Sequence, residues 1–228
     1  MVAKQTARPE GLREHNKSRR RKQILDATRR LLRRRPANEV SIEEIAELAE
    51  LAPATVYNLL GSRNAIWAAL IDDVLDQLSE ELAQLPDSDP IARAHAVITI
   101  SVRLFAADPK VHRQALLHRH TVSGGRDAIR HNPVTLQIDA MRDAIDAGTL
   151  ENNLTPDQLG QQVFVSYNGA LHFWTMGGLS VTEFERVALH GLYTVLAVAA
   201  TDETRPHFTR ELRKLGRGMT PRRVVAQP

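Results

Sequence analysis

A short segment in the first third of the chain carries side chains suited to binding nucleic acid. Residues 53–60 read PATVYNLL. The hydroxyls of Thr55 and Tyr57 can donate hydrogen bonds to phosphate oxygens, and the amide of Asn58 can contact a base edge. Pro53 and Ala54 share the outward or rim positions, and the inward face consists of Val56, Leu59 and Leu60. A helix of this kind fits the major groove of DNA, and an ordinary helical hairpin with an exposed tyrosine is the alternative.

A second helix must hold this segment in place. Residues 41–44 read SIEE, the pattern of a capping box in which Ser41 caps a new helix and Glu44 reaches back. The buried stripe of that helix consists of Ile42, Ile45, Ala46 and Ala49. After a break at residues 50–52, Pro53 suits the first position of the next helix. This spacing predicts a helix-turn-helix, in which the amide dipole at Ser41 and the side chain of Arg63 can each reach a phosphate.

The rest of the chain also has helical periodicity, and runs of β-branched residues with period two are missing. The pattern becomes helical at Lys17 and stops at Pro36, while Gly61 ends the short helix and Ser62 caps one that runs to about Leu85. Further helices are predicted near 89–107, 108–120, 133–147, 156–177, 181–200 and 203–215, with a loop at 123–125. The sequence therefore predicts an all-α fold, with an N-terminal three-helix helix-turn-helix domain followed by a larger helical domain.

Composition excludes several classes of protein. Apolar residues make up 43% of the chain, enough for a core, but aromatic residues only 4%. The absence of cysteine excludes disulfides, Cys-ligated zinc and thiol catalysis, and it suits the reducing cytoplasm. No apolar stretch reaches the roughly 18 residues of a membrane span. Residues 1–65 hold 14 Lys and Arg against 8 Asp and Glu, whereas residues 66–228 hold 16 against 19. The basic N-terminal part favours a polyanionic partner, and a basic solvated tail is the alternative.

From Lys22 to about Leu70 the chain resembles the N-terminal domain of the TetR family of bacterial transcriptional regulators. The resemblance is carried by ILDA at 24–27, SIEEIA at 41–46 and TVYNLLGSR at 55–63. It implies a homodimer that binds a palindromic operator in double-stranded DNA and takes a small-molecule effector among its C-terminal helices. It also implies that Thr55, Tyr57 and Arg63 contact phosphates, and that the residues nearest the bases are Pro53, Ala54 and Asn58.

The chain departs from the pattern of this family at three places. Glu50 stands where the family has glycine, so a left-handed turn conformation would be strained and the turn is expected to differ locally. Ala52 replaces the usual serine cap, which removes a capping bond worth about 1 kcal/mol. Leu59 and Leu60 replace an aromatic pair. These changes affect which operator is read rather than the fold.

Two late helices are expected to form the dimer. Residues 146–150 and 155–159 resemble the start of the penultimate long helix of the family. The helices near 156–177 and 181–200 would then pack against their copies as a four-helix interface. Small residues that suit close helix approach are Gly169, Ala170, Ala188, Gly191, Ala197 and Ala199. The alternative is that these residues are interior spacers within one subunit.

Polar and aromatic side chains within apolar helices are the candidates for an effector pocket, because such pockets are apolar with a few placed polar groups. They are Phe105, His118, Met141, Phe164, Tyr167, Asn168, Leu171, His172 and Trp174. Tyr167, Asn168 and Trp174 are preferred, although each residue singly also fits a core or interface position. The resulting domain prediction is a flexible basic arm at 1–16, the helix-turn-helix domain at 17–65, the effector and dimerisation domain at 66–215, and a flexible basic tail at 216–228.

Catalysis and metal binding are not expected. His118 and His120 are two residues apart, so in a helix they point to different faces, and no carboxylate completes a ligand set. No nucleophile with a base partner and no phosphate loop is visible, so the sequence predicts neither an enzyme nor a cofactor. The leading hypothesis is a ligand-responsive regulator, most simply a repressor. A structural DNA-binding protein of the same fold, without an effector, is the second hypothesis, and a helical enzyme or carrier is the third.

Overall fold

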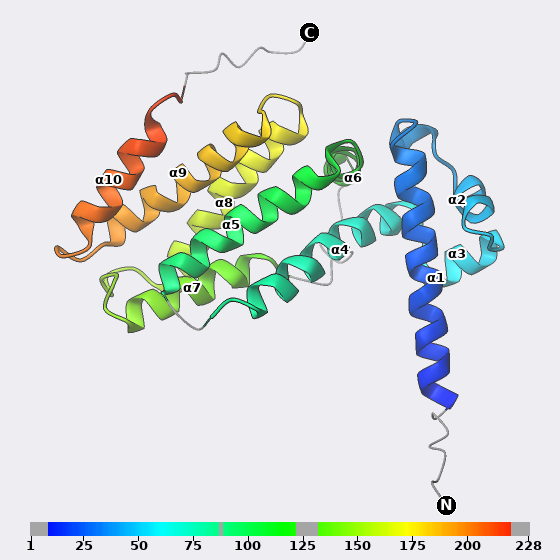
Figure 1. Ribbon diagram of the computed structural model, residues 1–228, viewed down its shortest axis with the longest axis horizontal. Coiled ribbons are helices and arrows are strands. Elements are labelled where there is room, and N and C mark those ends of the chain that lie inside the picture. The colour runs from blue at the N-terminus through cyan, green and yellow to red at the C-terminus, as the bar shows by residue number, and fades with distance from the viewer. Residues whose placement is uncertain (1–8, 87–88, 122–131, 220–228) are drawn as a thin grey trace, which may run out of the picture. The chain divides into compact units, whose positions relative to one another are not determined.

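The computed structural model describes residues 9–86, 89–121 and 132–219, and the regular elements in these ranges are helices, joined by loops, with one isolated bridge between Leu150 and Ala200 (Figure 1). The elements are α1 (Pro9–Leu32), η1 (Ala37–Glu39), α2 (Ile42–Leu48), α3 (Pro53–Leu60), α4 (Arg63–Ala83), α5 (Pro90–Ala107), α6 (Pro109–Thr121), α7 (Val134–Asp146), α8 (Pro156–Thr175), α9 (Val181–Ala199) and α10 (Arg205–Gly216). The predicted all-α fold is confirmed. The predicted loop at 123–125 lies outside the described residues, as do residues 1–8 of the predicted arm and 220–228 of the predicted tail.

Contacts divide the chain into two compact units. Unit 1 consists of residues 1–73 and 108–130, and unit 2 consists of residues 74–107 and 131–228. The division falls inside α4 rather than at the expected domain border of 65/66, and contacts such as Arg29 with Asp73 and Trp67 with His118 connect the first half of α4 to unit 1. Helix α6 also belongs to unit 1, although it is distant from α1 to α3 in sequence.

Unit 1 is built on the contacts of α1 with α2, α3 and α6. Its core contains the fully buried side chains of Ile24, Leu32, Ile45, Val56 and Trp67. Thr28 lies in the same stripe of α1, where its hydroxyl donates to the carbonyl of Ile24 at 2.8 Å. A buried threonine therefore occupies the core without an unsatisfied hydroxyl.

Helix α1 begins at Pro9, eight residues before the predicted start at Lys17. Residues 9–16, expected to belong to a flexible arm, are thus helical. The prediction depended on an apolar stripe, which starts only at Ile24, whereas a helix already nucleated in the core can extend through polar residues at little cost. An ion pair one turn apart, between Glu14 and Lys17 at 3.9 Å, accompanies this extension.

Unit 2 is a layered bundle in which α8 lies between α7 and α9, α5 contacts α7 and α9, and α10 packs on α9. Capping boxes at Thr155 and Ser180 begin α8 and α9. Two glycines permit close contact between helices. A Cβ on Gly160 would lie 2.6 Å from the backbone of Ile138, and one on Gly191 would lie 2.6 Å from Cβ of Ser166.

Helix α5 is, among the described residues, the one helix long and apolar enough to cross a membrane by length and composition alone. It carries Arg93 and Arg103, and it packs against α7 and α9. Its apolar side chains, including Ile98 and Val102, are buried in unit 2. These contacts explain its composition as that of a core helix.

Candidate nucleic-acid interface

The capping box at Ser41 fixes the start of α2. The Glu44 amide donates to the hydroxyl of Ser41 at 3.2 Å, and the Ser41 amide donates to the carboxylate of Glu44 at 3.0 Å. Arg35 donates to the other carboxylate oxygen at 2.8 Å. The Ser41 amide, followed by the Arg35 guanidinium, lowers the pKa of Glu44 to about 2. The predicted cap is confirmed, and Arg35 connects it to the segment after α1.

The turn between α2 and α3 keeps the geometry of a glycine turn. Glu50 has φ of 56°, the one positive value at a non-glycine position among the described residues. The Leu51 amide donates to the carbonyl of Ala46 at 2.9 Å, and the Glu50 amide donates to that of Glu47 at 3.1 Å. This bond pair is the Schellman motif, with Glu50 in the place where glycine is usual. The expected local change of the turn does not occur, because these two hydrogen bonds hold Glu50 in the left-handed backbone conformation.

Helix α3 exposes most of the residues that were predicted to point outward. Pro53 stands in its first turn, and Ala52 provides no side-chain cap. Val56 is fully buried and Leu60 nearly so, whereas the side chain of Tyr57 is 51% exposed. The other predicted outward residues, Pro53, Ala54 and Asn58, are exposed and Thr55 is half-buried. The helix therefore presents hydroxyl, amide and small apolar groups on one open face.

The side chain of Arg63 connects the start of α4 to the segment around η1. Its guanidinium donates to the carbonyl of Val40 at 3.2 Å and reaches that of Asn38 at 3.5 Å. The side chain is half-buried, so it bridges the first turn of α4 and the segment around η1. Ser62 caps α4 as predicted, accepting from the Ala65 amide at 3.3 Å. The predicted phosphate contact of Arg63 stays a prediction, and the side chain also has this bracing contact.

Arg21 was not selected from the sequence, yet it contacts α3 directly. Its guanidinium donates to the carbonyl of Leu59 at 3.2 Å, near the C-terminal end of α3. A cation at this position complements the partial negative charge of a helix C-terminus. The available signal was the run of basic residues from Arg19 to Lys22, which by itself did not show which member would turn toward α3.

The residues predicted for an effector pocket divide between the two units. In unit 2, Trp174 stacks on Phe184 with ring centroids 5.5 Å apart, and Tyr167 contacts Phe184 at 5.7 Å. Phe105 contacts Trp174 at 6.4 Å. Phe184, which contacts both Tyr167 and Trp174, was missed, because nothing in its local sequence indicates which rings it meets.

The remaining predicted residues have varied positions. Met141 and Leu171 are buried, Phe164 and Asn168 are half-buried, and His172 is exposed. The side-chain amide of Asn168 donates to the backbone carbonyl of Phe164 within α8 at 2.9 Å. His118 lies in unit 1, where its ring contacts Trp67 at 5.8 Å and burial lowers its pKa. His118 therefore belongs to a different cluster from Tyr167 and Trp174.

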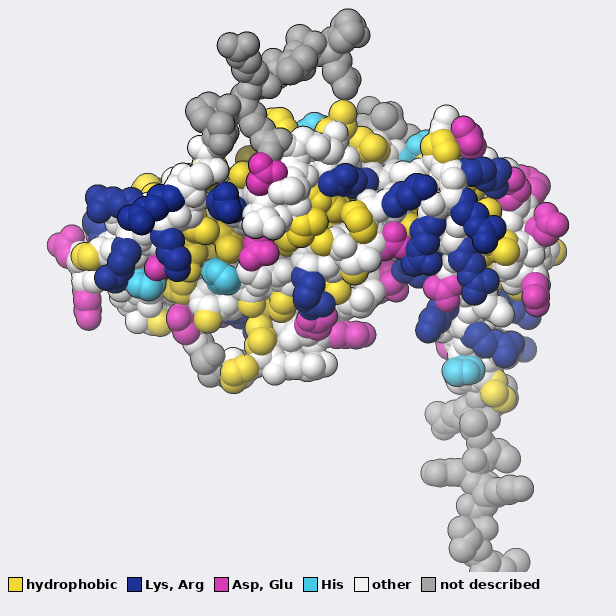
Figure 2. All heavy atoms as spheres, turned by 45° about the horizontal axis from the view of Figure 1, so that its top comes forward, with side chains coloured by type: hydrophobic (Ala, Val, Ile, Leu, Met, Phe, Trp, Pro, Cys, Tyr) yellow, Lys and Arg dark blue, Asp and Glu magenta, His cyan; other side chains and the backbone are white. Residues whose placement is uncertain are grey.

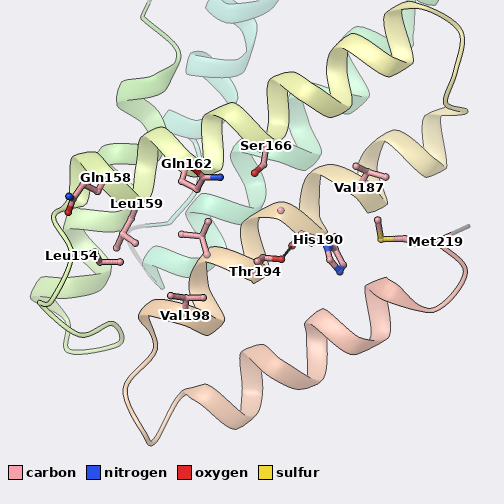
Figure 3. A pocket seen from close by; sticks show the side chains of 12 residues that line it. Leu154, Gln158, Leu159, Gln162, Ser166, Val187, His190, Thr194, Val198 and Met219 are labelled. Carbon is pink, nitrogen blue, oxygen red and sulfur yellow. Dashed lines mark hydrogen bonds between the residues drawn. The ribbon is translucent and has the colours of Figure 1, made fainter. Parts of the chain in front are cut away.

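A groove of about 460 Å³ lies along α8 and α9 (Figure 3). It is lined by Leu154, Gln158, Leu159, Gln162, Ser166, Val187, His190, Gly191, Thr194, Val195, Val198 and Met219. Figure 3 shows Gln162 and Ser166 reaching into it from α8, and His190 and Thr194 from α9. None of the predicted pocket residues lines this groove.

A capped helix, a tight turn and a short exposed helix on an all-helical scaffold define a helix-turn-helix DNA-binding protein. Residues 24–70 match the family of bacterial regulatory proteins described as the tetR family. Residues 24–70 of this chain are therefore similar to the DNA-binding domain of the TetR family. No curated protein matches the chain.

Solved structures show the same fold over most of the chain. A TetR transcription regulator from Haloarcula marismortui superposes with a TM-score of 0.66 at 19% identity, covering 81% of this chain and 100% of that one. CprB, a TetR family protein from S. coelicolor, gives 0.59 at 17% identity, covering 88% and 100%. SmeT, the repressor of the Stenotrophomonas maltophilia multidrug efflux pump SmeDEF, gives 0.58 at 20% identity, covering 81% and 92%.

Proposed function

We propose that this protein is a cytoplasmic, ligand-responsive transcriptional repressor that binds a palindromic operator as a homodimer and leaves it when a small molecule binds. The observation that carries the proposal is the exposed face of α3, with Tyr57 and Asn58 open and Val56 and Leu60 buried beneath them. Such a face can enter the major groove while its scaffold stays folded. The proposed phosphate contacts are Thr55, Tyr57 and Arg63. The N-terminus of α2 at Ser41 would approach a further phosphate. The residues proposed to lie nearest the bases are Pro53, Ala54 and Asn58.

The proposed dimer uses α8 and α9. Large apolar side chains on these two helices are unusually open: Val198 is 63% exposed and Phe173 is 51% exposed. Val165, Phe173 and Met176 recur at helical spacing on α8, so they share a side of that helix. A second copy packed on this side would remove them from water. The groove between α8 and α9 lies on the same surface, because Val198 lines it.

The small residues of these helices have two different roles. Ala170, Ala188 and Ala199 are buried within unit 2, and Gly191 accommodates Ser166 of the same chain. This burial favours the alternative that they are interior spacers within one subunit. Gly169 differs, because a Cβ built there has nothing within 4 Å. It is therefore the small residue proposed to meet the second copy.

The proposed effector site is centred on Tyr167. Its hydroxyl oxygen is buried and makes no hydrogen bond of good geometry within the described residues. Burial raises the pKa of Tyr167, while hydrogen bonding with Ser101 opposes this shift weakly. A buried hydroxyl with only this weak contact is poorly satisfied, so it would favour a ligand that supplies a hydrogen-bond acceptor. The aromatic rings of Phe105, Trp174 and Phe184 would provide the apolar surroundings of an apolar or weakly polar effector.

Release from DNA would follow from the spacing of the two reading helices. A dimer must place them about 34 Å apart, or at a multiple of this distance, to enter successive major grooves on one side of the duplex. An effector that binds more tightly to a dimer with another spacing shifts the population toward that dimer and thereby lowers the operator affinity.

Selection of duplexes from a random pool tests the proposal. The full-length protein should enrich a palindromic site, and some members of a library of apolar compounds should release it. Tyr167→Phe should change the compound concentration needed for release, while Tyr193→Phe, which removes the same atom elsewhere in unit 2, should not. Failure to enrich any duplex would overturn the DNA-binding role. Enrichment without release by any compound, and without stabilisation in a thermal-shift screen, would instead identify a structural DNA-binding protein.

A further inference from the structure

The N-terminal extension of α1 is an exposed basic helix. Every residue from Gly11 to Arg20 is exposed, so this stretch packs against nothing in unit 1. Residues 11–22 contain six Lys and Arg residues and one acidic residue. Figure 2 shows Lys and Arg side chains gathered along α1. Among the side chains that the structure describes, Arg19, Arg20 and Lys22 form no ion pair with a carboxylate, whereas Lys17 lies 3.9 Å from Glu14.

The cations continue the core-facing stripe of α1. At about 100° per residue, Arg13, Lys17 and Arg20 fall on the same side of the helix as Ile24, which is fully buried in unit 1. The stripe is therefore apolar where α1 has core partners and basic where it has none. We call Arg13, Lys17 and Arg20 the basic stripe. Its cations are three and four residues apart, a spacing at which like charges repel and weaken the helix.

The recognition helix ends beside the start of this extension. Arg21, the residue after Arg20, donates to the carbonyl of Leu59 in the last turn of α3. Figure 1 shows α1 continuing past α3 toward the N-terminus. The surface formed by α3 is thus continuous with the basic side of α1, within one unit of the protein.

We propose that the basic stripe is a second DNA contact, which binds the phosphates that flank the bases read by α3. The proposal rests on the proposed operator binding and adds the extension to it. From Arg13 to Arg20 the helix rises by about 10 Å, which equals about three steps of 3.4 Å along one strand. Phosphates at this spacing would relieve the repulsion among the three cations, and the contact would increase affinity without reading sequence.

The test compares two variants that lose the same charge. The stripe variant carries Arg13→Gln, Lys17→Gln and Arg20→Gln, and the matched control carries Arg210→Gln, Arg213→Gln and Arg217→Gln, three exposed cations at α10. Binding of each protein to the selected operator and to a random-sequence duplex is measured over about 0.05 to 0.3 M salt. The stripe variant should lose between about tenfold and a hundredfold affinity near physiological salt, and its log–log salt slope should fall by about 2.7 per chain. Both duplexes should be affected alike.

Two further experiments test where the basic stripe contacts the DNA. A variant with Arg13→Lys, Lys17→Arg and Arg20→Lys keeps the charges and should bind like the unaltered protein. Shortening the operator at its flanks should weaken the unaltered protein and leave the stripe variant unchanged, because the variant has already lost those contacts. Circular dichroism checks that each variant remains helical.

The outcomes separate this inference from the proposed function. If the stripe variant binds like the α10 control while Tyr57→Phe weakens operator binding, the stripe contact is wrong and operator reading by α3 stands. If the unaltered protein binds no duplex, both proposals fall. Retained DNA binding by the stripe variant with lost binding to phosphatidylserine vesicles would also overturn the inference, in favour of a membrane surface.

Discussion

Arg29 of α1 forms an ion pair with Asp73 of α4, with Nη2 and Oδ2 2.5 Å apart. The same guanidinium contacts Asp26 at 3.0 Å, one turn earlier in α1. The Arg29 side chain is only 19% exposed, so the cation is held by two carboxylates in a partly shielded position. This pair fastens the N-terminal helix to the first half of α4 and helps to explain why α4 contributes to unit 1.

Replacing Arg29 by alanine should destabilise unit 1 by about 1–2 kcal/mol, because a shielded ion pair is lost and Asp73 is left without this cation. Urea unfolding followed by circular dichroism measures the change. Arg33→Ala is the matched control: Arg33 pairs with Asp108 at 2.7 Å but is 56% exposed, so its loss should cost less than about 1 kcal/mol. Equal effects of the two variants would show that shielding of Arg29 does not matter.

Acid should weaken the cap of α2 in a defined range. The folded pKa of Glu44, about 2, lies below its ordinary value of 4.5, so its contribution to stability is fully present above pH 4.5 and is lost as the pH falls toward 2. The free energy of unfolding of the unaltered protein should therefore exceed that of Glu44→Gln at pH 6, and this difference should shrink as the pH falls to 2. The exposed Glu43 in the same turn is the control site, and Glu43→Gln should keep the pH dependence. A difference in the free energy of unfolding that stays constant from pH 6 to pH 2 would contradict the lowered pKa of Glu44.

The left-handed Glu50 predicts a stabilising substitution. Glycine adopts this conformation without the steric cost of a Cβ, so Glu50→Gly should raise the free energy of unfolding by about 1 kcal/mol. The same change inside α2, Glu47→Gly, should lower it by a similar amount, because glycine is unfavourable within a helix. Denaturant midpoints compare the two. A destabilised Glu50→Gly variant would mean that the glutamate side chain makes a contact worth more than the strain.

Operator binding should depend on the hydroxyl of Tyr57. Tyr57→Phe removes a donor from the exposed face of α3 and should weaken binding several-fold, with little change in the salt slope, because a neutral hydroxyl releases no counterion. Fluorescence anisotropy at several salt concentrations measures both quantities. Arg63→Ala should show a similar loss together with reduced stability, because Arg63 also braces the carbonyls of Asn38 and Val40. Unchanged binding in both variants would contradict the assigned reading face.

A charge on the open side of α9 should prevent dimerisation. Val198→Glu places a carboxylate at an apolar side chain that is 63% exposed in the single chain, so folding should survive while association fails. Sedimentation velocity distinguishes monomer from dimer. Leu85→Glu changes another exposed apolar residue, outside α8 and α9, and should leave the assembly intact. A dimer that survives Val198→Glu would place the interface elsewhere.

Local signals in the sequence were sufficient to predict most helix boundaries. The Ser41 and Thr155 caps, the break at 50–52 and the stop at Gly61 each depend on residues within four positions of one another. Such interactions form wherever the residues occur, so they are visible without knowledge of the fold. The exposed residues of α3 were predicted in the same way: Val56 and Leu60, one turn apart, are buried, whereas Tyr57 and Asn58 are exposed.

Contacts between distant residues were decided only by the tertiary structure. Arg21 meets Leu59, Phe184 joins Trp174, and Gly191 makes room for Ser166, yet nothing in the neighbouring sequence of each residue identifies its partner. The early start of α1 and the left-handed Glu50 also depend on a helix already held in a core and on a turn already closed. The sequence therefore determined that the chain has a helix-turn-helix and where its helices lie. Packing determined which side chains face a partner, because that choice depends on pairs of surfaces rather than on local spacing.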